Sequence, residues 1–587
     1  MILDTDLIET SCSLFADICV IGAGPAGIVI ARACAASGLS VLLIESGGLR
    51  PDPGSQALCR GAVADPALHA PPDLFRRRGF GGSSVIWGGR CVPLDRLDFR
   101  ARPWLGLEAA WPIEYDDVKT YWRGAADILE LGAPDFDAAS AIPGGMKPTI
   151  DGFKHPHVST ESIERFSRPT DFGQSYRADM KASRQITLLM RATCIEISMS
   201  DSHAQVRAAE LRTRRGFAVF AKARSFVLAA GGLEVPRLLL ASHRQCSAGL
   251  GNAYDQVGRY YMCHIAGTTG IFTAAPKTVT WHGYERDVAG VYCRRRFSIE
   301  ADAQEALRIG NAVARLHHPR ADDPAHASGP LSALYLAKRT LPAEYSRRMQ
   351  DLDVRRSLMP HVANVIRDGG RTFGFGVHVL RDRIFARRKF PSVIVAPRSG
   401  TFSLDVHAEQ LPNAASRLRL GNQRDRFGTP ELRIDWHYGA EDLRTVRVTV
   451  ALIAEALRAG GHGTLHFDPA EIDADMLRDG AYGGHHLGGA RMSASPRSGV
   501  VDANCRVHGI GNLFVAGGAV FPTSGQANPT FTIVALALRL AEHLVSGWAK
   551  PQQPGAATTP SRILIKDAVP HAAPLPAYEG AGAMQDS

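Results

Sequence analysis

The chain has 587 residues, of which 45% are hydrophobic and 21% charged, and its formal net charge is +9. This length predicts two or three domains with an ample core, and the composition is ordinary for a soluble globular protein. The positive charge is mild for the length, and without a zinc-finger, RRM-like or bZIP-like pattern it gives no reason to expect a nucleic-acid partner.

Signals for metal centres and for export are missing from the sequence. The ten cysteines form no C-x-x-C pair, so structural zinc, c-type haem and iron–sulfur clusters are poorly supported, and we predict no metal site. The N-terminus carries acidic residues where a signal peptide would be basic. We find no run of about twenty apolar residues, so we predict no membrane span. The cysteine usage favours a reducing cytoplasm.

The first predicted unit is a βαβ motif that contains a glycine-rich fingerprint. Gly22, Gly24 and Gly27 have the G-x-G-x-x-G spacing, between a predicted strand at 18–21 and a predicted helix at 28–37. These glycines allow a tight turn, close backbone approach to a pyrophosphate and close helix packing, while the helix N-terminus attracts phosphate. The alternative is a glycine-rich turn in another α/β fold. The fingerprint therefore predicts a dinucleotide site.

Glu45 supports the dinucleotide interpretation. It ends the second predicted strand, and its carboxylate would accept hydrogen bonds from a ribose diol. A carboxylate at this place argues against a 2′-phosphate, so NADP is not expected. The fingerprint alone does not distinguish FAD from NAD.

The rest of the chain alternates predicted strands and helices. We predict a helix at 231–240, an amphipathic helix at 441–459 and an apolar helix at 531–545. The Pro-, Ala- and Gly-rich residues 550–587 are predicted to be disordered. The predicted strands lie at 186–189, 194–199, 208–213, 217–221, 225–230 and 513–516.

Two stretches in the second half are notably basic. Residues 331–367 are predicted to be helical, and five basic residues are interleaved with apolar ones at 381–389. This second cluster could contact an acidic substrate, a partner or a membrane surface. A solvated helix face with an apolar inner stripe is the interpretation that we favour.

Three sequence blocks, in this order, resemble the glucose–methanol–choline (GMC) oxidoreductases. The first joins the 22–45 unit to the glycine-rich loop 81–84, and the second is 229–239. The third begins with the H-x-x-G-G-x-x-M pattern at 485–492 and continues through 513–530. Three shorter segments are also similar, the last two to the branch that holds pyranose oxidases and sugar or sugar-acid dehydrogenases: 257–264, 111–117 and 409–413.

The resemblance implies an α/β fold with two parts. One is a Rossmann-like FAD-binding domain built from discontinuous segments, and the other is an α+β substrate domain with a sheet backed by helices. The implied FAD domain comprises 15–100, 187–270 and 480–546. The implied substrate domain comprises 101–186 and 271–479, and 547–587 form a tail.

The resemblance also implies which residues contact the cofactor. Gly22, Gly24, Gly27, Gly82 and Ser83 would line the pyrophosphate. Glu45 would hold the adenosine ribose, Cys194 would take the position whose backbone meets the adenine, and Trp87 would lie in the loop beside the flavin. Asn528 and Thr530, at the C-terminal block, complete the predicted FAD contacts.

His485 and Asn528 are the predicted catalytic pair. A histidine, with an ordinary pKa of about 6.5, suits removal of a hydroxyl proton near neutral pH. The family pairs this base with a second His or an Asn, which would hold the substrate oxygen. The register of the following glycines favours His485 over His486 as the base, although a turn residue before Pro529 is the alternative for Asn528. We assign His264, His282 and His437 no catalytic role.

Two departures from the family pattern concern the flavin. Some relatives carry a histidine just before the position of Trp87 that bonds covalently to the flavin, and here that position is Ile86. We therefore predict dissociable FAD. Where many relatives have an Asp near the ribityl chain, this chain has Gly517-Gly518-Ala519.

The predicted function is an FAD-dependent oxidoreductase that takes hydride from the CH–OH group of an alcohol or sugar-like substrate. The electron acceptor would be O2, or a quinone or cytochrome. The alternatives are a ketosteroid dehydrogenase-, fumarate reductase- or hydroxylase-like flavoenzyme, or a flavin-binding protein without turnover. The paired His485 and Asn528 argue against both.

Overall fold

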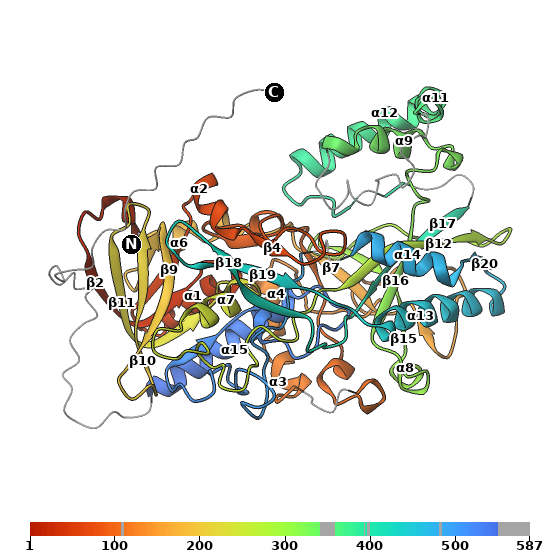
Figure 1. Ribbon diagram of the computed structural model, residues 1–587. Helices are drawn as coiled ribbons and strands as arrows, with labels where there is room; N and C mark the ends of the chain where they lie inside the picture. The colour runs from red at the N-terminus through yellow and green to blue at the C-terminus, as the bar shows by residue number, and fades with distance from the viewer. Residues whose placement is uncertain (107–110, 341–357, 393, 396–399, 481–483, 550–587) are drawn as a thin grey trace, which may run out of the picture.

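Two large sheets with helices packed on both dominate the molecule (Figure 1). The fold is therefore α/β, as predicted. Segments that are far apart in the sequence build the sheets, so residues from distant parts of the chain meet at their edges. The structure is a computed structural model, and it describes residues 1–106, 111–340, 358–392, 394–395, 400–480 and 484–549.

The first sheet has eight strands and is parallel over most of its width. β2 (Cys12–Ile21) pairs in parallel with β3 (Val41–Glu45) on one side and with β11 (Ala218–Leu228) on the other. α1 (Pro25–Ala36) connects β2 to β3, which confirms the predicted βαβ motif. The other strands are β1 (Ile2–Asp4), β8 (Ile186–Met190), β9 (Ala192–Met199), β10 (Val206–Thr213) and β21 (Leu513–Val515).

One prediction for this sheet is wrong. Separate strands were expected at 217–221 and 225–230, but the structure has the single strand β11. β11 pairs with β2 along nearly its whole length, while its other side pairs first with β10 and then with β21. Because neighbours hold both sides, the strand stays continuous through a charged stretch that propensity alone would break.

The parallel strands of the first sheet all end at one edge. Gly22 follows β2, Ser46 follows β3, Gly231 follows the end of β11 and Gly517 follows the end of β21. Ligands of open parallel sheets bind outside the carboxyl ends of the strands. The fold thus gathers the three glycine-rich blocks of the sequence at the expected place for a ligand.

The second sheet is antiparallel, in the order β20-β12-β17-β16-β15-β6. The long helix α13 (Ala440–Ala459), predicted at 441–459, buries Val446, Val450 and Ile453 in the same core as this sheet, and α14 (Pro469–Asp479) packs on β12. The strands are β20 (Gly463–His466), β12 (Ile265–Ala274), β17 (Thr401–Ala408), β16 (Ala312–His317), β15 (Phe297–Ile299) and β6 (Val158–Ser159).

Two smaller sheets contain the remaining strands. One has the order β13-β14-β7-β5 and the other β18-β19-β4. Their strands are β13 (Glu285–Arg286), β14 (Tyr292–Arg295), β7 (Ile163–Phe166), β5 (Arg90–Cys91), β18 (Arg417–Arg424), β19 (Pro430–Asp435) and β4 (Gly61–Val63).

A helical lobe lies beside the second sheet, at the upper right of Figure 1. It contains α9 (Gly329–Leu336), α11 (Met359–Arg367), α12 (Gly369–His378) and the π-helical turn η8 (Val379–Phe385). These helices confirm the helical prediction at the two ends of 331–367, whose middle lies outside the described residues. The apolar inner stripe expected at 381–389 is wrong, because Ile384 and Phe385 are 55% and 78% exposed.

The C-terminal helix α15 (Thr530–Ala549) matches the predicted apolar helix. By length and composition alone, Thr530–Trp548 could cross a membrane, although no such stretch was found in the sequence. However, half of this stretch is buried within the molecule, and α15 packs on α1 and on α4 (Trp122–Ile128), as a core helix does. The predicted disorder of 550–587 falls outside the described residues.

Candidate active site

A cavity of about 1000 Å³ is lined by both large sheets. The first sheet contributes the turns after β2, β3 and β11, and the second contributes His264, Thr268, Asp405 and His407. Every residue that we predicted for the site lines this cavity except Gly27. The distant sequence blocks therefore form one continuous site.

The glycines at the carboxyl edge of the first sheet differ in what a side chain would meet at each position. Gly22 has φ of +107°, and a Cβ there would lie 2.5 Å from Ala229 O. A Cβ on Gly27 would lie 1.9 Å from Gly22 O, so this glycine allows the helix to pack against the turn. A Cβ on Gly24 would meet only the Cα of Gly82, at 4.0 Å. Gly24 and Gly82 thus leave an open cradle at the N-terminus of α1, as a pyrophosphate requires.

Glu45 is buried beside this cradle. Its carboxylate accepts hydrogen bonds from the backbone N–H of Ala23 (3.1 Å) and of Gly47 (2.8 Å). Each carboxylate oxygen can accept more than one hydrogen bond, so the group still has capacity for a ribose hydroxyl. Glu45 therefore fits the predicted ribose contact and also fixes the turn.

The other predicted cofactor residues line the same cavity. Ser83 Oγ donates to Phe75 O (3.3 Å), and Trp87 Nε1 donates to Thr170 O (3.0 Å), which fixes the indole beside the cavity. Cys194 lies on β9, and Thr530 is the first residue of α15. Ile86, where a covalent flavin link would require histidine, also lines the cavity.

His485 and Asn528 lie in direct contact. Asn528 Nδ2 is 2.9 Å from His485 Nε2, and His485 Nδ1 is 2.9 Å from Nδ1 of His264. An amide N–H can only donate, so in this arrangement Nε2 of His485 accepts and its proton sits on Nδ1, where it is donated to His264. His264 thus fixes the tautomer that leaves Nε2, on the Asn528 side, as the basic nitrogen.

A second histidine supports the first. The ring of His407 stacks on His264 with centroids 4.4 Å apart, and its Nδ1 donates to Gln526 O (2.6 Å). We assigned His264 no role and did not single out His407. Both come from strand ends of the second sheet, and only the folded chain brings them to His485. His282 and His437 do not line the cavity.

His486 points elsewhere. Its ring stacks near His69 and Tyr261, with centroids 6.2 and 6.3 Å away. Burial lowers the pKa of His69 to about 4, so this neighbour is neutral at pH 7. The geometry therefore separates the two adjacent histidines, and His485 is the one that faces Asn528.

Burial keeps the three clustered histidines neutral. The pKa of His485 is held well below its usual value, chiefly by burial. Burial likewise lowers the pKa of His264 to about 4 and that of His407 well below its usual value. All three rings are therefore unprotonated at neutral pH, as a base that must accept a proton requires.

The same three rings have spacing that permits a metal ion. His264, His407 and His485 each offer a nitrogen within 4.8 Å of the others. The hydrogen bond between His264 and His485 already uses two of these nitrogens. The hydrogen-bonding roles above explain the cluster without an ion.

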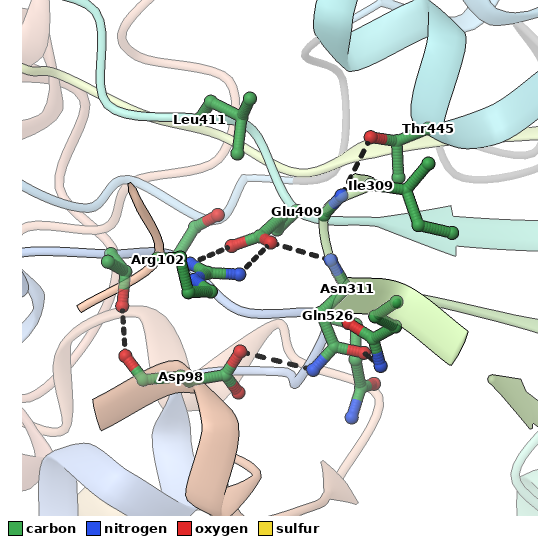
Figure 2. A network of polar contacts seen from close by, with 12 residues as sticks. Asp98, Arg102, Ile309, Asn311, Glu409, Leu411, Thr445 and Gln526 are labelled. Atoms are coloured by element: carbon green, nitrogen blue, oxygen red, sulfur yellow. Dashed lines mark hydrogen bonds and ion pairs between the residues drawn. The ribbon is translucent and has the colours of Figure 1, made fainter. Parts of the chain in front are cut away.

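The loop that carries Asn528 is held by a buried polar network (Figure 2). Gln526 donates to Asp95 (3.0 Å) and accepts from Arg296 (2.8 Å), and Thr523 Oγ donates to Asp98 O (3.1 Å). Nearby, Arg102 forms a two-point ion pair with Glu409, which also accepts from the backbone of Asn311 (2.6 Å). These contacts join the loop to the second sheet, so Asn528 is positioned before substrate arrives.

The chain is similar to known proteins along most of its length. The model of the GMC oxidoreductase family matches residues 412–537, which include His485 and Asn528. Paromamine 6'-oxidase of Streptomyces fradiae is 25% identical, over 90% of each chain. 2-Methyl-1,2-propanediol dehydrogenase of Mycolicibacterium austroafricanum is 23% identical, over 90% of this chain and 95% of the relative. The large subunit of fructose dehydrogenase of Gluconobacter japonicus is 21% identical, over 91% and 98%.

The site and these similarities define an FAD-dependent oxidoreductase that acts on CH–OH groups. The glycine cradle fits the cofactor, and the relatives are oxidases and dehydrogenases of alcohols and sugars. The chain is thus similar to GMC oxidoreductases: residues 412–537 match the model of that family, and the relatives named above align with about 90% of the chain.

Proposed function

We propose that His485 is the base and Asn528 the oxygen-holding group in oxidation of an alcohol or sugar-like substrate. The contact between His485 Nε2 and Asn528 Nδ2 carries this proposal. Bound FAD supplies the hydride acceptor. The substrate hydroxyl would replace the direct hydrogen bond between the two side chains, which must move apart to admit it. It would then give its proton to Nε2 and leave the developing alkoxide facing the Asn528 amide.

His264 stabilises the base once it is protonated. The imidazolium of His485 keeps its Nδ1–H directed at the neutral Nδ1 of His264. A hydrogen bond to a charged group contributes about 1.5–3 kcal/mol. The ring of His264 is therefore a positioning group that fixes the tautomer and supports the charge.

His264→Leu is expected to slow alcohol-dependent flavin reduction about 10–100-fold, the rate equivalent of one hydrogen bond to a charged group. His264→Gln, whose amide oxygen can still accept from Nδ1–H, should recover most of the rate. Stopped-flow reduction of the anaerobic enzyme measures both. Equal losses in the two variants would show that His264 only fills space.

Gly24→Ala is expected to leave the fold intact but to abolish FAD binding. Gly24 has φ of −82° and ψ of −173°, which alanine adopts, and the added methyl meets no protein atom nearer than 4.0 Å. The methyl would instead occupy the pyrophosphate cradle. The ratio of flavin to protein absorbance after purification, with circular dichroism as the control, tests this. Gly22→Ala, which would clash with Ala229 O, should lose the fold as well.

We also propose that the FAD is held without a covalent bond, because Ile86 offers no nucleophile at the position used by relatives with a linked flavin. Acid precipitation should release all of the yellow colour into the supernatant. Flavin that stays with the pellet would contradict this proposal.

The experiment that tests the function is anaerobic mixing with sugars, polyols and aromatic alcohols. Bleaching of the flavin absorbance identifies an oxidised substrate, and readmitted air distinguishes an O2-using oxidase from a dehydrogenase that needs a quinone or cytochrome. If no alcohol bleaches the flavin while a ketone reoxidises the reduced enzyme, the proposal is wrong. We retain the cytoplasm as the proposed location, based on the cysteine usage.

A further inference from the structure

The cavity extends past the catalytic histidines along the second sheet, and this extension carries an excess of arginines. On the facing strands, Ala266 lies opposite His407, and Thr268 lies opposite Asp405 two residues farther from the site. Val379 of η8 and Pro391, which follows the helical lobe in sequence, also line it. The charged residues that line this part are Arg90, Arg294, Arg320, Arg383 and Arg478 against Asp322 and Asp405.

Both acids in this part of the cavity already have basic partners. Asp322 forms an ion pair with Arg320 (3.0 Å), and Asp405 lies 3.4 Å from Arg315. Arg320 and Arg478 also share Asp475, at 3.2 and 3.0 Å. Among the described residues, neither of these two acids forms an ion pair with Arg294 or Arg383.

Arg294 is a buried cation whose guanidinium lies over the Tyr284 ring, 5.4 Å from its centroid. It is 3% exposed, and among the described residues its guanidinium donates one hydrogen bond, from Nη2 to Leu316 O (2.6 Å). Glu164, opposite it on β7, is bound instead by Arg315 (2.8 Å) and Arg90 (3.4 Å). A guanidinium has five N–H donors, so Arg294 keeps unused donors beside the cavity.

Arg383 lines the cavity from the helical lobe, and it too makes few hydrogen bonds to the described residues. Its Nη1 donates to Pro391 O (3.2 Å), and among the described residues it forms no ion pair. Its neighbour Arg381, by contrast, is paired with Asp382 (2.7 Å) and is exposed. Two arginines with free donors therefore line the cavity from different elements, β14 and η8.

We propose that the substrate alcohol carries an anionic group, a carboxylate or a phosphate ester, that Arg294 and Arg383 bind. A buried charge is costly unless it is well paired, and Arg315 and Arg90 already bind Glu164, the carboxylate opposite Arg294. A planar guanidinium binds oxyanions through two parallel hydrogen bonds. The anionic end of the substrate would supply a further partner, while the hydroxyl end reaches His485. This inference rests on the proposed alcohol oxidation and names its substrate class.

Matched neutral and anionic substrates test the inference. Anaerobic flavin reduction is measured with glucose, gluconate, glucuronate and glucose 6-phosphate. We expect kcat/KM for at least one anionic member to exceed that for glucose by about 10-fold or more, the effect of one charge-assisted hydrogen bond. Which anion is preferred distinguishes carboxylate from phosphate. Equal or better use of the neutral sugar overturns the inference and leaves the proposed function intact.

Variants test the two arginines directly. Arg383→Gln and Arg294→Gln should raise KM for the anionic substrate about 10-fold or more without changing that for a neutral one. Arg381→Gln removes the same charge two residues away, outside the cavity, and should change neither. If Arg294→Gln does not fold, Arg383→Gln at the rim still decides the question. Selective loss supports the anion site, and equal loss for both substrates overturns it.

A binding measurement separates this inference from the proposed chemistry. Glutarate has carboxylates but no hydroxyl, so its binding to the flavin-loaded enzyme, measured by calorimetry, involves no oxidation. We expect binding that Arg383→Gln weakens about 10-fold and Arg381→Gln does not. Such binding, together with a flavin that no alcohol bleaches, would overturn the alcohol oxidation but support the anion site. Binding that is absent, or unchanged in Arg383→Gln, overturns the anion site.

Discussion

His485→Ala should lower the rate constant for flavin reduction by alcohol about 10²–10⁴-fold, the range that general-base catalysis contributes. Among the described residues, this side chain is the base that contacts Asn528, and its Nε2 is the nitrogen that the His264 hydrogen bond leaves unprotonated. The measurement is single-turnover reduction of the anaerobic enzyme. FAD content should stay at the wild-type level, because the cradle at Gly24 and Gly82 is built from other segments.

His486→Ala is the matched control. Its ring stacks near His69 and Tyr261 and does not reach Asn528, so this variant should lose far less of the rate. The pH dependence gives a second check. The base must be unprotonated, and burial lowers the pKa of His485, so the rate should stay flat from pH 8 to about 6.5 and fall only at lower pH. A larger loss in His486→Ala than in His485→Ala would reverse the assignment.

The sequence singled out His485 and Asn528 because local patterns carry both residues. The H-x-x-G-G pattern and the Asn-Pro pair each have a fixed spacing to neighbours that the fold requires, such as Gly488, where a Cβ would lie 2.1 Å from Tyr260 O. His264 and His407 have no such pattern. They take part because β12 and β17 pair in one register, and a one-residue shift would turn His407 away from the site.

The arginine-lined part of the cavity could not be predicted for a related reason. Arg294 lies on a short strand and Arg383 in a helical lobe, and nothing in the sequence shows that both guanidinium groups line one cavity. The sequence shows that the cluster at 381–389 is basic, but its arginines make different contacts. Arg383 lines the cavity, Arg381 pairs with Asp382, and Arg388 donates to the backbone of Phe166 and Glu130.

Asn528→Ala should slow flavin reduction about 10²–10³-fold, as removal of one donor to a developing oxyanion does. The Asn528 amide contacts His485 Nε2, where the substrate hydroxyl would be held, and the network through Gln526 fixes its loop. Asn528→Asp should be slower still, because a carboxylate opposes the negative charge that develops on the substrate oxygen.

Asn528→His separates a chemical role from a structural one. An imidazole N–H can also donate, so this variant should recover part of the rate that Asn528→Ala loses. A residue needed only for the turn before Pro529 would give another order: the three variants would lose thermal stability together, and the aspartate, a good turn former, would be the mildest change. Melting temperature and reduction rate measured on the same preparations therefore decide between the two roles.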